Sequence, residues 1–396
     1  AGSAIAGYWL QDWVGQRTTS FGKQLWWQWV LDKEHYPRWH AMREKLEKKK
    51  QYLLGYFNPF LVPKEKVAEG QRDLFEEAKS AGYLVKNQQG DVYPSPVTFT
   101  AYLVDLTNPQ AYFWLKEVMK EVVRKTKMKG WMADFGEALP VDAALYSGDA
   151  KEIHNQYPVL WAKLNAEVVR ELKGEGELFY FMRAGYTGSL KHNHMFWTGD
   201  QMVHWDGKDG LRASLKGILS GGFSGINFNH SDIGGYTTLS KLKIKRKTEL
   251  LKRWSELNAF TAIFRSHEGN QPEHNVQNYH ENNGILEHTS KMSRLFHALK
   301  FYRLSLFEEA VKNNLPLIRH PYLLEKEYQE NWRTRDEEEI QFYLGDEILV
   351  APVLKESWKK RSVELPLVKK AVKKKWIQLW SGKSYTPGLH KLSAPI

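Results

Sequence analysis

The sequence predicts an α/β protein: a (β/α)8 barrel, in which eight parallel strands alternate with helices, followed by a small β domain. Short apolar runs alternate with longer amphipathic patterns over roughly the first 265 residues, and a barrel of this kind typically needs ~250 residues. From about residue 340 the pattern changes to short strand-like runs separated by turns. The alternative, a doubly wound dinucleotide-binding sheet, has no support because no Gly-x-Gly-x-x-Gly motif follows the first strand.

The barrel strands and helices can be placed by their patterns. Strand candidates lie at 5–13, 51–59, 102–109, 130–136, 177–185, 194–200, 225–232 and 260–267. Helical patterns lie between most of them, at 36–49, 65–82, 110–128 and 142–172. Strands of the β appendage are expected at 340–354, 362–367, 375–380 and 389–395. We therefore expect a barrel domain in residues 1–335 and a partial C-terminal β domain in residues 336–396.

The charge of the chain is unevenly distributed. The net charge is +11, but residues 355–375 alone hold nine Lys and Arg against two Glu. A basic surface over the whole body, as nucleic-acid-binding proteins have, is therefore absent, and no nucleic-acid partner is expected. The local cluster is better explained by lysines that protect edge strands from aggregation than by an anionic partner surface.

The residue types exclude several classes of chemistry. The absence of Cys excludes disulfides, Cys-ligated zinc and thiol catalysis, and it fits a reducing, cytoplasmic compartment. No stretch approaches the ~20 apolar residues of a membrane span, and residues 1–10 lack the pattern of a signal peptide. Sixteen Trp fit a large aromatic core or, alternatively, a sugar-binding cleft. The sequence leaves the compartment and the oligomeric state open.

Polar residues stand at the end of nearly every strand candidate. Because the active site of a (β/α)8 barrel lies at the C-terminal ends of its strands, these side chains are expected to face one mouth. Crowded carboxylates differ in pKa, which separates an acid from a base, and glycoside hydrolysis uses such a pair. Taken singly, each Asp is better explained as a helix cap or turn residue, but the set as a whole is not. The residues are Asp12, Asp134, Glu137, Arg183, Asp200, His230, Asp232 and His267.

Metal and cofactor chemistry has weaker support. The His-Asn-His motif at 192–194 could suggest a metal site, but surface or packing histidines explain it better. No Walker loop is present, and the Ser-Gly-Gly-Phe-Ser-Gly segment lacks the spacing of a nucleophile elbow. We expect neither a metal ion nor a cofactor.

Five long motifs in order resemble those of the family-31 glycoside hydrolases, especially the subgroup that contains the bacterial sulfoquinovosidases. They are GWMADFGEALP, FMRAG, FWTGDQ, HSDIGGYTTL and RSHEGNQP. The resemblance covers nearly the whole chain. It implies a catalytic (β/α)8 barrel between an N-terminal β-sandwich and C-terminal β domains, and α-glycoside hydrolysis with retention and without a metal. The sandwich has no counterpart in this sequence.

The resemblance also implies roles for particular residues. Asp134 occupies the place of the nucleophile, and Asp200 that of the acid/base. Glu137 corresponds to a supporting carboxylate. Sugar hydroxyls would be bound by Asp12, Arg183, Asp232 and His267, and the wall of the sugar pocket would be formed by Trp131 and Trp197.

One position departs from the pattern of the sulfoquinovosidases. Gln11, Trp27 and Tyr236 match places that hold the sulfonate group, but the place of the sulfonate-binding Arg is taken by Gln24. A neutral amide cannot neutralise a sulfonate, and charge-assisted hydrogen bonds are roughly twice as strong as neutral ones. Lys23 or Arg17 could supply the charge instead.

Three hypotheses follow. The first is a retaining exo-α-glycosidase that acts on an α-linked glycoside with an uncharged or differently anionic sugar. The second is a sulfoquinovosidase proper, which differs from the first only around Gln24. The third, from another class, is a non-catalytic carbohydrate-binding or scaffold protein, against which the presence of both carboxylates argues.

Overall fold

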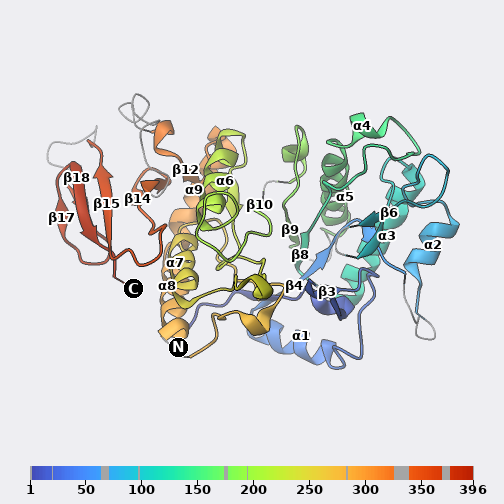
Figure 1. Ribbon diagram of the computed structural model, residues 1–396, viewed down its shortest axis with the longest axis horizontal. Helices are drawn as coiled ribbons and strands as arrows, with labels where there is room; N and C mark the ends of the chain where they lie inside the picture. The colour runs from blue at the N-terminus through green and yellow to red at the C-terminus, as the bar shows by residue number, and fades with distance from the viewer. Residues whose placement is uncertain are drawn as a thin grey trace. The chain divides into compact units, whose positions relative to one another are not determined.

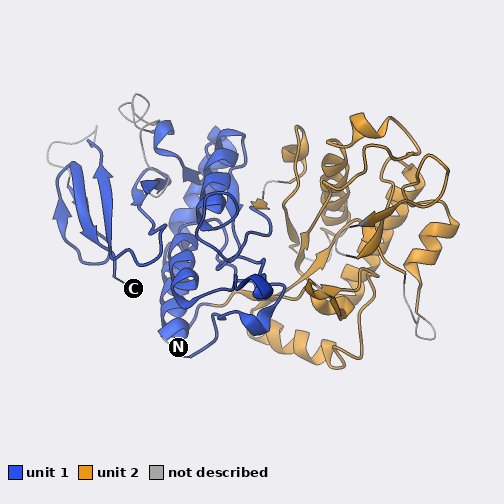
Figure 2. Ribbon diagram, viewed as in Figure 1, with its two compact units in different colours: residues 1–4, 198–396 blue, residues 5–197 orange. Residues whose placement is uncertain are grey.

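The computed structural model (Figure 1) describes residues 2–19, 21–63, 71–96, 99–173, 177–193, 195–281, 284–324, 339–367 and 375–395. It divides into two compact units: unit 2 comprises residues 5–197, and unit 1 comprises residues 1–4 and 198–396 (Figure 2). Each unit is described by itself. In the described ranges, no helix combines the length and apolar character that crossing a membrane requires.

Unit 2 is built on a parallel sheet. Its strand order is β1 (Gly7–Trp9), β4 (Tyr52–Phe57), β8 (Gly130–Ala133), β9 (Phe179–Met182) and β10 (Met195–Trp197). All four residues of β8 are buried, as expected for a central parallel strand covered on both faces. Gly130 is required there, because a Cβ atom would lie 2.3 Å from the carbonyl oxygen of Phe179.

Helices and short hairpins connect these strands. The longest helix, α3, begins where the Asn108 side chain accepts the backbone N–H groups of Gln110 and Ala111, and it ends at Lys127 in the left-handed conformation (φ 56°). The helices are α1 (Trp39–Lys48), α2 (Leu74–Ser80), α3 (Pro109–Thr126), α4 (Ala150–Ile153) and α5 (Tyr157–Glu171), with 3-10 turns η1 (Asp12–Val14) and η3 (Ser189–Lys191). The antiparallel strands are β2 (Gln16–Thr19), β3 (Gly22–Leu25), β5 (Phe60–Leu61), β6 (Pro94–Pro96) and β7 (Thr100–Leu103).

The third strand candidate, 102–109, is not part of the parallel sheet. Strand β7 covers its start and pairs antiparallel with β5 and β6, while β4 pairs directly with β8. The rest of the segment is a turn into α3, in which the Asp105 carboxylate accepts the N–H groups of Thr107 and Tyr146 at 2.9 and 2.7 Å. These side-chain acceptors replace the partners that a strand would provide.

Among its described residues, unit 1 contains four helices, the short strand β11 and the β appendage. The helices are α6 (Leu211–Phe223), α7 (Thr248–Asn258), α8 (Ile285–Ala298) and α9 (Lys300–Asn313), with 3-10 turns η4 (Ser240–Leu242), η5 (Pro272–His274) and η7 (Pro321–Leu323). Strand β11 (Phe228–His230) confirms the candidate at 225–232.

The eighth strand candidate, 260–267, is a loop with a single bridge between Ile233 and Ser266. The buried guanidinium of Arg303 donates to the carbonyl oxygen of Thr261 at 3.1 Å and to that of Ala259. The arginine side chain therefore satisfies backbone carbonyl groups that would otherwise accept hydrogen bonds from a neighbouring strand.

The predicted β appendage is confirmed. A three-stranded antiparallel sheet joins β12 (Ile318–Arg319), β13 (Phe342–Leu344) and β14 (Ile348–Val350). Two further pairs follow: β15 (Lys360–Leu365) with β18 (Gly388–Ser393), and β16 (Trp376–Ile377) with β17 (Ser384–Tyr385). The expected domain boundary at 335/336 and most of the second half of the basic cluster lie outside the described residues.

Candidate active site

One face of the unit 2 sheet carries the central predicted residues. In the register of the sheet, Tyr56 of β4 lies beside Met132 of β8, and Met132 lies beside Phe181 of β9. Side chains alternate between the two faces of a strand. Asp134 and Arg183 stand two positions after Met132 and Phe181, so they continue the same face at the carboxyl ends of their strands.

Asp134 follows directly after β8, and the residue is only 6% exposed. One carboxylate oxygen, Oδ2, accepts a hydrogen bond from the Tyr56 hydroxyl at 2.5 Å. The other, Oδ1, accepts the backbone N–H of Phe135 at 2.8 Å and lies 3.2 Å from Nη1 of Arg183. Two donors and a cation favour the ionised form, which is the form that can act as a nucleophile.

Arg183 is shared between two carboxylates. Its Nε and Nη2 donate to the same oxygen of Glu137, at 2.9 and 2.7 Å, while its Nη1 faces Asp134. The Glu137 side chain is 47% exposed, whereas that of Asp134 is 9% exposed. Glu137 thus holds the arginine at the buried carboxylate, and the supporting role expected for it stays a prediction.

Phe135 adopts a conformation that is uncommon for an L-residue. Its φ angle is +57°, in the left-handed region, at a cost of roughly 1–2 kcal/mol. This conformation follows directly after Asp134, whose carboxylate accepts the Phe135 amide. The Phe135 ring centre lies 4.3 Å from the guanidinium carbon of Arg183 and 5.2 Å from the ring of Trp27.

The sequence analysis missed Tyr56. It lies at the carboxyl end of β4, 78 positions before Asp134, and its hydroxyl also accepts a hydrogen bond from Nδ2 of Asn58 at 3.0 Å. Burial raises the pKa of Tyr56 well above its ordinary value, and the neighbouring Asp134 raises it further. Tyr56 therefore remains a hydroxyl donor to the carboxylate at neutral pH. Its only signal in the sequence was a polar atom near a strand end.

We expect Tyr56→Phe to lower kcat/KM roughly 10- to 150-fold, because a hydrogen bond to a charged acceptor contributes ~1.5–3 kcal/mol. The measurement is steady-state turnover of an aryl α-glycoside. Tyr157→Phe is the matched control: Tyr157 is also fully buried in unit 2, and its hydroxyl donates to the carbonyl oxygen of Val104 at 2.6 Å. Equal losses in both variants would show that the effect is one of folding and would contradict a role for Tyr56.

Asp12 and Gln11 follow β1. The Asp12 carboxylate accepts the Tyr36 hydroxyl at 2.5 Å and lies 2.7 Å from Nε2 of His35, yet the side chain keeps 28% exposure. Nε2 of Gln11 lies 3.6 Å from the sulfur of Met132, so Gln11 reaches the same face as Asp134. His35 and Tyr36 hold Asp12 in place; neither was foreseen, because they act from a segment more than 20 residues away.

The structure corrects the expectation that Trp131 walls the sugar pocket. Trp131 is fully buried, its Nε1 donates to Oδ1 of Asn165 on α5 at 2.7 Å, and its ring stacks on Tyr180. The reason is the period of the strand: Trp131 and Asp134 are three positions apart, and an odd separation puts side chains on opposite faces. Met132, two positions before Asp134, occupies the face expected for Trp131.

Trp197 lies on the same face as Phe181. The two rings meet edge to face, with centroids 5.5 Å apart, and Trp197 is 2% exposed. Its indole Nε1 is buried and has no hydrogen-bond partner within the described part of the chain. A donor left in this state is suited to a ligand oxygen, so Trp197 remains a candidate for the pocket.

Trp27 lies in an aromatic cluster beside the Asp134 segment. Its ring contacts Phe60, Phe99 and Phe135, with centroids 5.5, 4.8 and 5.2 Å away. Its Nε1 is buried and lacks a protein hydrogen-bond partner among the described residues. Trp27 therefore presents an indole donor next to the ring that supports Arg183.

The β2–β3 hairpin brings Arg17 next to Gln24. The two residues are direct cross-strand partners, so their side chains leave the same face of the hairpin. The guanidinium carbon of Arg17 lies 4.3 Å from the ring centre of Trp26 and 3.9 Å from that of Phe99. Lys23 pairs with Thr18 instead, on the opposite face, and both are exposed.

In unit 1, three segments carry the remaining predicted residues. Asp200 is exposed, and its carbonyl oxygen accepts the Thr237 hydroxyl at 2.9 Å. The N–H groups of Tyr236 and Thr237 both donate to the carbonyl oxygen of Gln201, at 2.8 and 2.9 Å. The rings of Tyr236 and His267 meet with centroids 4.7 Å apart. Backbone bonds and this ring contact join the segments of Asp200, Tyr236 and His267 into one platform.

Asp232 is completely buried and forms a salt bridge with Arg265, whose Nε also donates to Nε2 of His230 at 3.2 Å. Arg265 was not among the predicted residues. The preceding residue, Ser231, is held by α7: its hydroxyl accepts Nε1 of Trp254 at 2.9 Å. The sugar-binding role expected for Asp232 stays a prediction.

His267 has a defined hydrogen-bonding arrangement. Its Nδ1 accepts the backbone N–H of Gly269 at 2.9 Å. Burial lowers the pKa of His267 well below its ordinary value, and the cations Arg265 and Arg246 lower it further. The imidazole is therefore neutral at pH 7 with its proton on Nε2, which makes Nε2–H a donor suited to a sugar hydroxyl.

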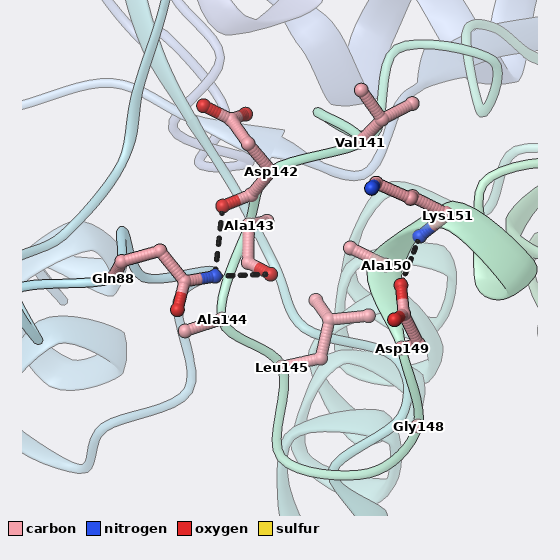
Figure 3. A pocket seen from close by; sticks show the side chains of 10 residues that line it. All are labelled: Gln88, Val141, Asp142, Ala143, Ala144, Leu145, Gly148, Asp149, Ala150 and Lys151. Atoms are coloured by element: carbon pink, nitrogen blue, oxygen red, sulfur yellow. Dashed lines mark hydrogen bonds between the residues drawn. The ribbon is translucent and has the colours of Figure 1, made fainter.

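A hollow of about 480 Å3 lies elsewhere in unit 2, between Gln88 and residues 141–151 (Figure 3). Gln88 Nε2 donates there to the carbonyl oxygens of Asp142 and Ala143. The Asp149 carboxylate caps α4 by accepting the Lys151 N–H. None of the predicted site residues lines this hollow, and the carboxylate at the strand end is the better candidate for chemistry.

The structure shows no metal-binding cluster within the ranges it describes: no three His, Asp or Glu residues are grouped so that they could hold an ion. Of the 192–194 motif, residue 194 lies outside those ranges.

A parallel α/β sheet whose strands end in a buried, hydrogen-bonded carboxylate and an arginine places the chain among barrel proteins with carboxylate chemistry at the strand ends. Comparison with known families agrees. The profile of the "glycosyl hydrolases family 31 TIM-barrel domain" matches residues 8–302, and that of the "glycosyl hydrolase family 31 C-terminal domain" matches residues 315–396. The chain belongs to glycosyl hydrolase family 31, with a TIM barrel followed by the C-terminal domain of that family.

Individual relatives are similar over the whole chain. The sulfoquinovosidase of Escherichia coli (strain K12) is 39% identical over 398 residues, covering 100% of this chain and 56% of the relative. That of Agrobacterium fabrum (strain C58) is 39% identical over 396 residues, covering 98% and 56%. A solved family 31 sulfoquinovosidase from E. rectale, in complex with the aza-sugar inhibitor IFGSQ, superposes with a TM-score of 0.88 at 37% identity, covering 98% and 56%. The chain thus spans about half the length of the relatives it matches.

Proposed function

We propose that the protein is a retaining exo-α-glycoside hydrolase. The observation that carries this proposal is Asp134: a nearly buried carboxylate at a strand end that receives the Tyr56 hydroxyl, the Phe135 amide and the Arg183 cation. A carboxylate oriented and kept charged in this way is suited to attack an anomeric carbon. Exo action follows from the family resemblance.

The proposed mechanism uses two displacements. Asp134 attacks the anomeric carbon and forms a glycosyl-enzyme, while Asp200, as a carboxylic acid, protonates the departing oxygen. Asp200 then removes a proton from water, which hydrolyses the intermediate. Asp200 is exposed and so can exchange its proton with solvent between the steps. The His267 imidazole and the Arg183 guanidinium are the residues to which the family resemblance assigns the binding of sugar hydroxyls.

A screen of aryl α-glycosides (gluco, galacto, xylo and sulfoquinovo) against the wild type and Asp134→Asn tests this function. Turnover of one substrate by the wild type, with retention of anomeric configuration, is the expected result. No turnover of any substrate, combined with saturable sugar binding, would support the alternative of a non-catalytic carbohydrate-binding protein.

We further propose that the substrate is an α-sulfoquinovoside, with Arg17 supplying the charge that Gln24 lacks. The relatives named above are sulfoquinovosidases, and their similarity extends over 98–100% of this chain. Arg17 is the cross-strand partner of Gln24 and stacks on Phe99, which also contacts Trp27. A planar guanidinium can donate to two oxygens of a sulfonate at once, and the Trp27 N–H adds a neutral donor.

We expect Arg17→Gln to lower kcat/KM for an aryl α-sulfoquinovoside roughly 10- to 150-fold, since a charged hydrogen bond contributes ~1.5–3 kcal/mol. The glucoside, which carries no charge at the sixth carbon, should be unaffected. Lys23→Gln is the control on the opposite face of the hairpin and should change neither substrate. If Arg17→Gln leaves sulfoquinovoside activity unchanged, Arg17 does not supply the charge. If the wild type does not turn over the sulfoquinovoside and Gln24→Arg does, the substrate of the natural protein is not a sulfosugar.

A further inference from the structure

We propose that Arg246 is a positioning residue that clamps together the two loops bearing Tyr236 and His267. The inference rests on the proposed function, because it concerns the sugar-binding residues of that same site. Arg246 lies in neither loop's sugar-binding motif, but it is 2% exposed and lies between the two loops.

The Arg246 side chain reaches both loops at once. Its Nε donates to the carbonyl oxygen of Gly234 at 3.1 Å and its Nη2 to that of Gly235 at 2.5 Å. Its Nη1 donates to Oε1 of Gln277 at 3.3 Å. Only a planar guanidinium can direct donors to three acceptors along different edges in this way.

The first loop is shaped around the arginine. Gly234 and Gly235 have φ angles of +90° and +79°, which turn both carbonyl groups toward Arg246. A Cβ atom on Gly234 would lie 2.7 Å from Cδ of Arg246, and one on Gly235 would lie 2.8 Å from the carbonyl oxygen of Met202. Glycine is therefore needed at both positions, and Tyr236 follows immediately after them.

The second loop is held through amide side chains. The backbone N–H of Arg246 donates to Oδ1 of Asn275 at 3.0 Å, an atom that also accepts the Thr238 hydroxyl at 2.9 Å. Gln277, the acceptor of Nη1, donates through its own Nε2 to the carbonyl oxygen of Glu268 at 3.0 Å. Arg246 is thus linked to the residue directly after His267.

Arg246 retains its charge in this setting. Burial lowers its pKa to about 10, while the nearby acidic groups of Asp232 and Glu268 act in the opposite direction. It is therefore a cation at neutral pH. Its charge also helps to keep His267 neutral, so the clamp influences both the position and the protonation of that imidazole.

The test compares Arg246→Met and Arg246→Lys with Arg361→Met. Arg361 is an equally buried arginine, 2% exposed, whose three donors reach the carbonyl oxygens of Pro352, Ser362 and Ile340 in the β appendage. Each variant is measured for thermal unfolding, for kcat and KM on an aryl α-glycoside, and for the imidazole NMR signals of His267, assigned with His267→Gln.

We expect Arg246→Met to raise KM about 10- to 100-fold with a smaller change in kcat, because the affected groups bind the sugar in ground and transition states alike. The His267 signals should shift. Arg246→Lys, which keeps the charge but carries its N–H donors on a single nitrogen, should recover part of both effects and remains informative if the Met variant does not fold. Arg361→Met should lower the unfolding temperature only.

Unchanged KM and unchanged His267 signals in a folded Arg246 variant would overturn the clamp. If the wild type shows no turnover, the proposed function fails, but the His267 signals still decide whether Arg246 positions the loops.

Discussion

Asp134→Asn should reduce kcat about 10^4- to 10^6-fold, because the amide cannot form the glycosyl-enzyme. Glu137, which shares Arg183 with Asp134, is held by two donors of that arginine and is not expected to replace Asp134. The measurement is turnover of an aryl α-glycoside, together with the mass of the protein after incubation with a slowly hydrolysed 2-fluoro glycoside. The wild type should gain the mass of one sugar and the variant none.

Asp105→Asn is the matched control. Asp105 is also a buried aspartate of unit 2, 4% exposed, and it accepts hydrogen bonds in a turn outside the site. It should lower stability without abolishing turnover. A kcat for Asp134→Asn within tenfold of the wild type would rule out Asp134 as the nucleophile.

Asp200→Ala should affect substrates according to their leaving group. Aryl glycosides with poor leaving groups need proton donation and should lose about 10^2- to 10^4-fold in kcat/KM. Dinitrophenyl glycosides should still form the intermediate, which then accumulates because water has lost its base. Added azide needs no deprotonation, so it should accelerate turnover and yield an α-glycosyl azide.

The control for Asp200 is Asp206→Ala, a carboxylate of unit 1 with a side chain that is 42% exposed and that accepts the N–H groups of Lys208 and Asp209 in a turn. It should show no dependence on the leaving group. An Asp200→Ala variant that loses activity equally on all substrates and forms no azide product would exclude Asp200 as the acid/base.

The elements that local patterns determine were predictable. The short apolar run at 130–133 predicted β8, all four residues of which are buried, and the carboxylate directly after the run pointed to Asp134. Trp131 shows the limit of an assignment by motif: the family resemblance implied a place in the pocket wall, whereas strand alternation puts its side chain on the face that contacts α5. The segment 102–109 had the composition of a strand, but its Asp105 and Asn108 side chains made it a turn and a helix cap.

The supporting residues of the site were not predictable. Tyr56 and Asp134 are 78 positions apart, and Arg265 and His230 are 35 apart. Their function arises from contacts that exist only once the chain is folded, and nothing in their local sequence distinguishes them from ordinary core residues. Arg246 is the clearest example. Its proposed role depends on the backbone carbonyl groups to which it donates, and backbone carbonyl groups leave no mark in the sequence.

The left-handed Phe135 has a consequence for how this chain can evolve. A single ring touches Arg183, which faces the carboxylate of Asp134, and Trp27, which belongs to the region proposed to recognise the substrate's charge. A substitution that adapts the Trp27 cluster to a new sugar will therefore also disturb the cation beside Asp134. Changes of specificity along this route are pleiotropic: they alter the rate at the same time, and compensating substitutions must follow before a new preference can become established.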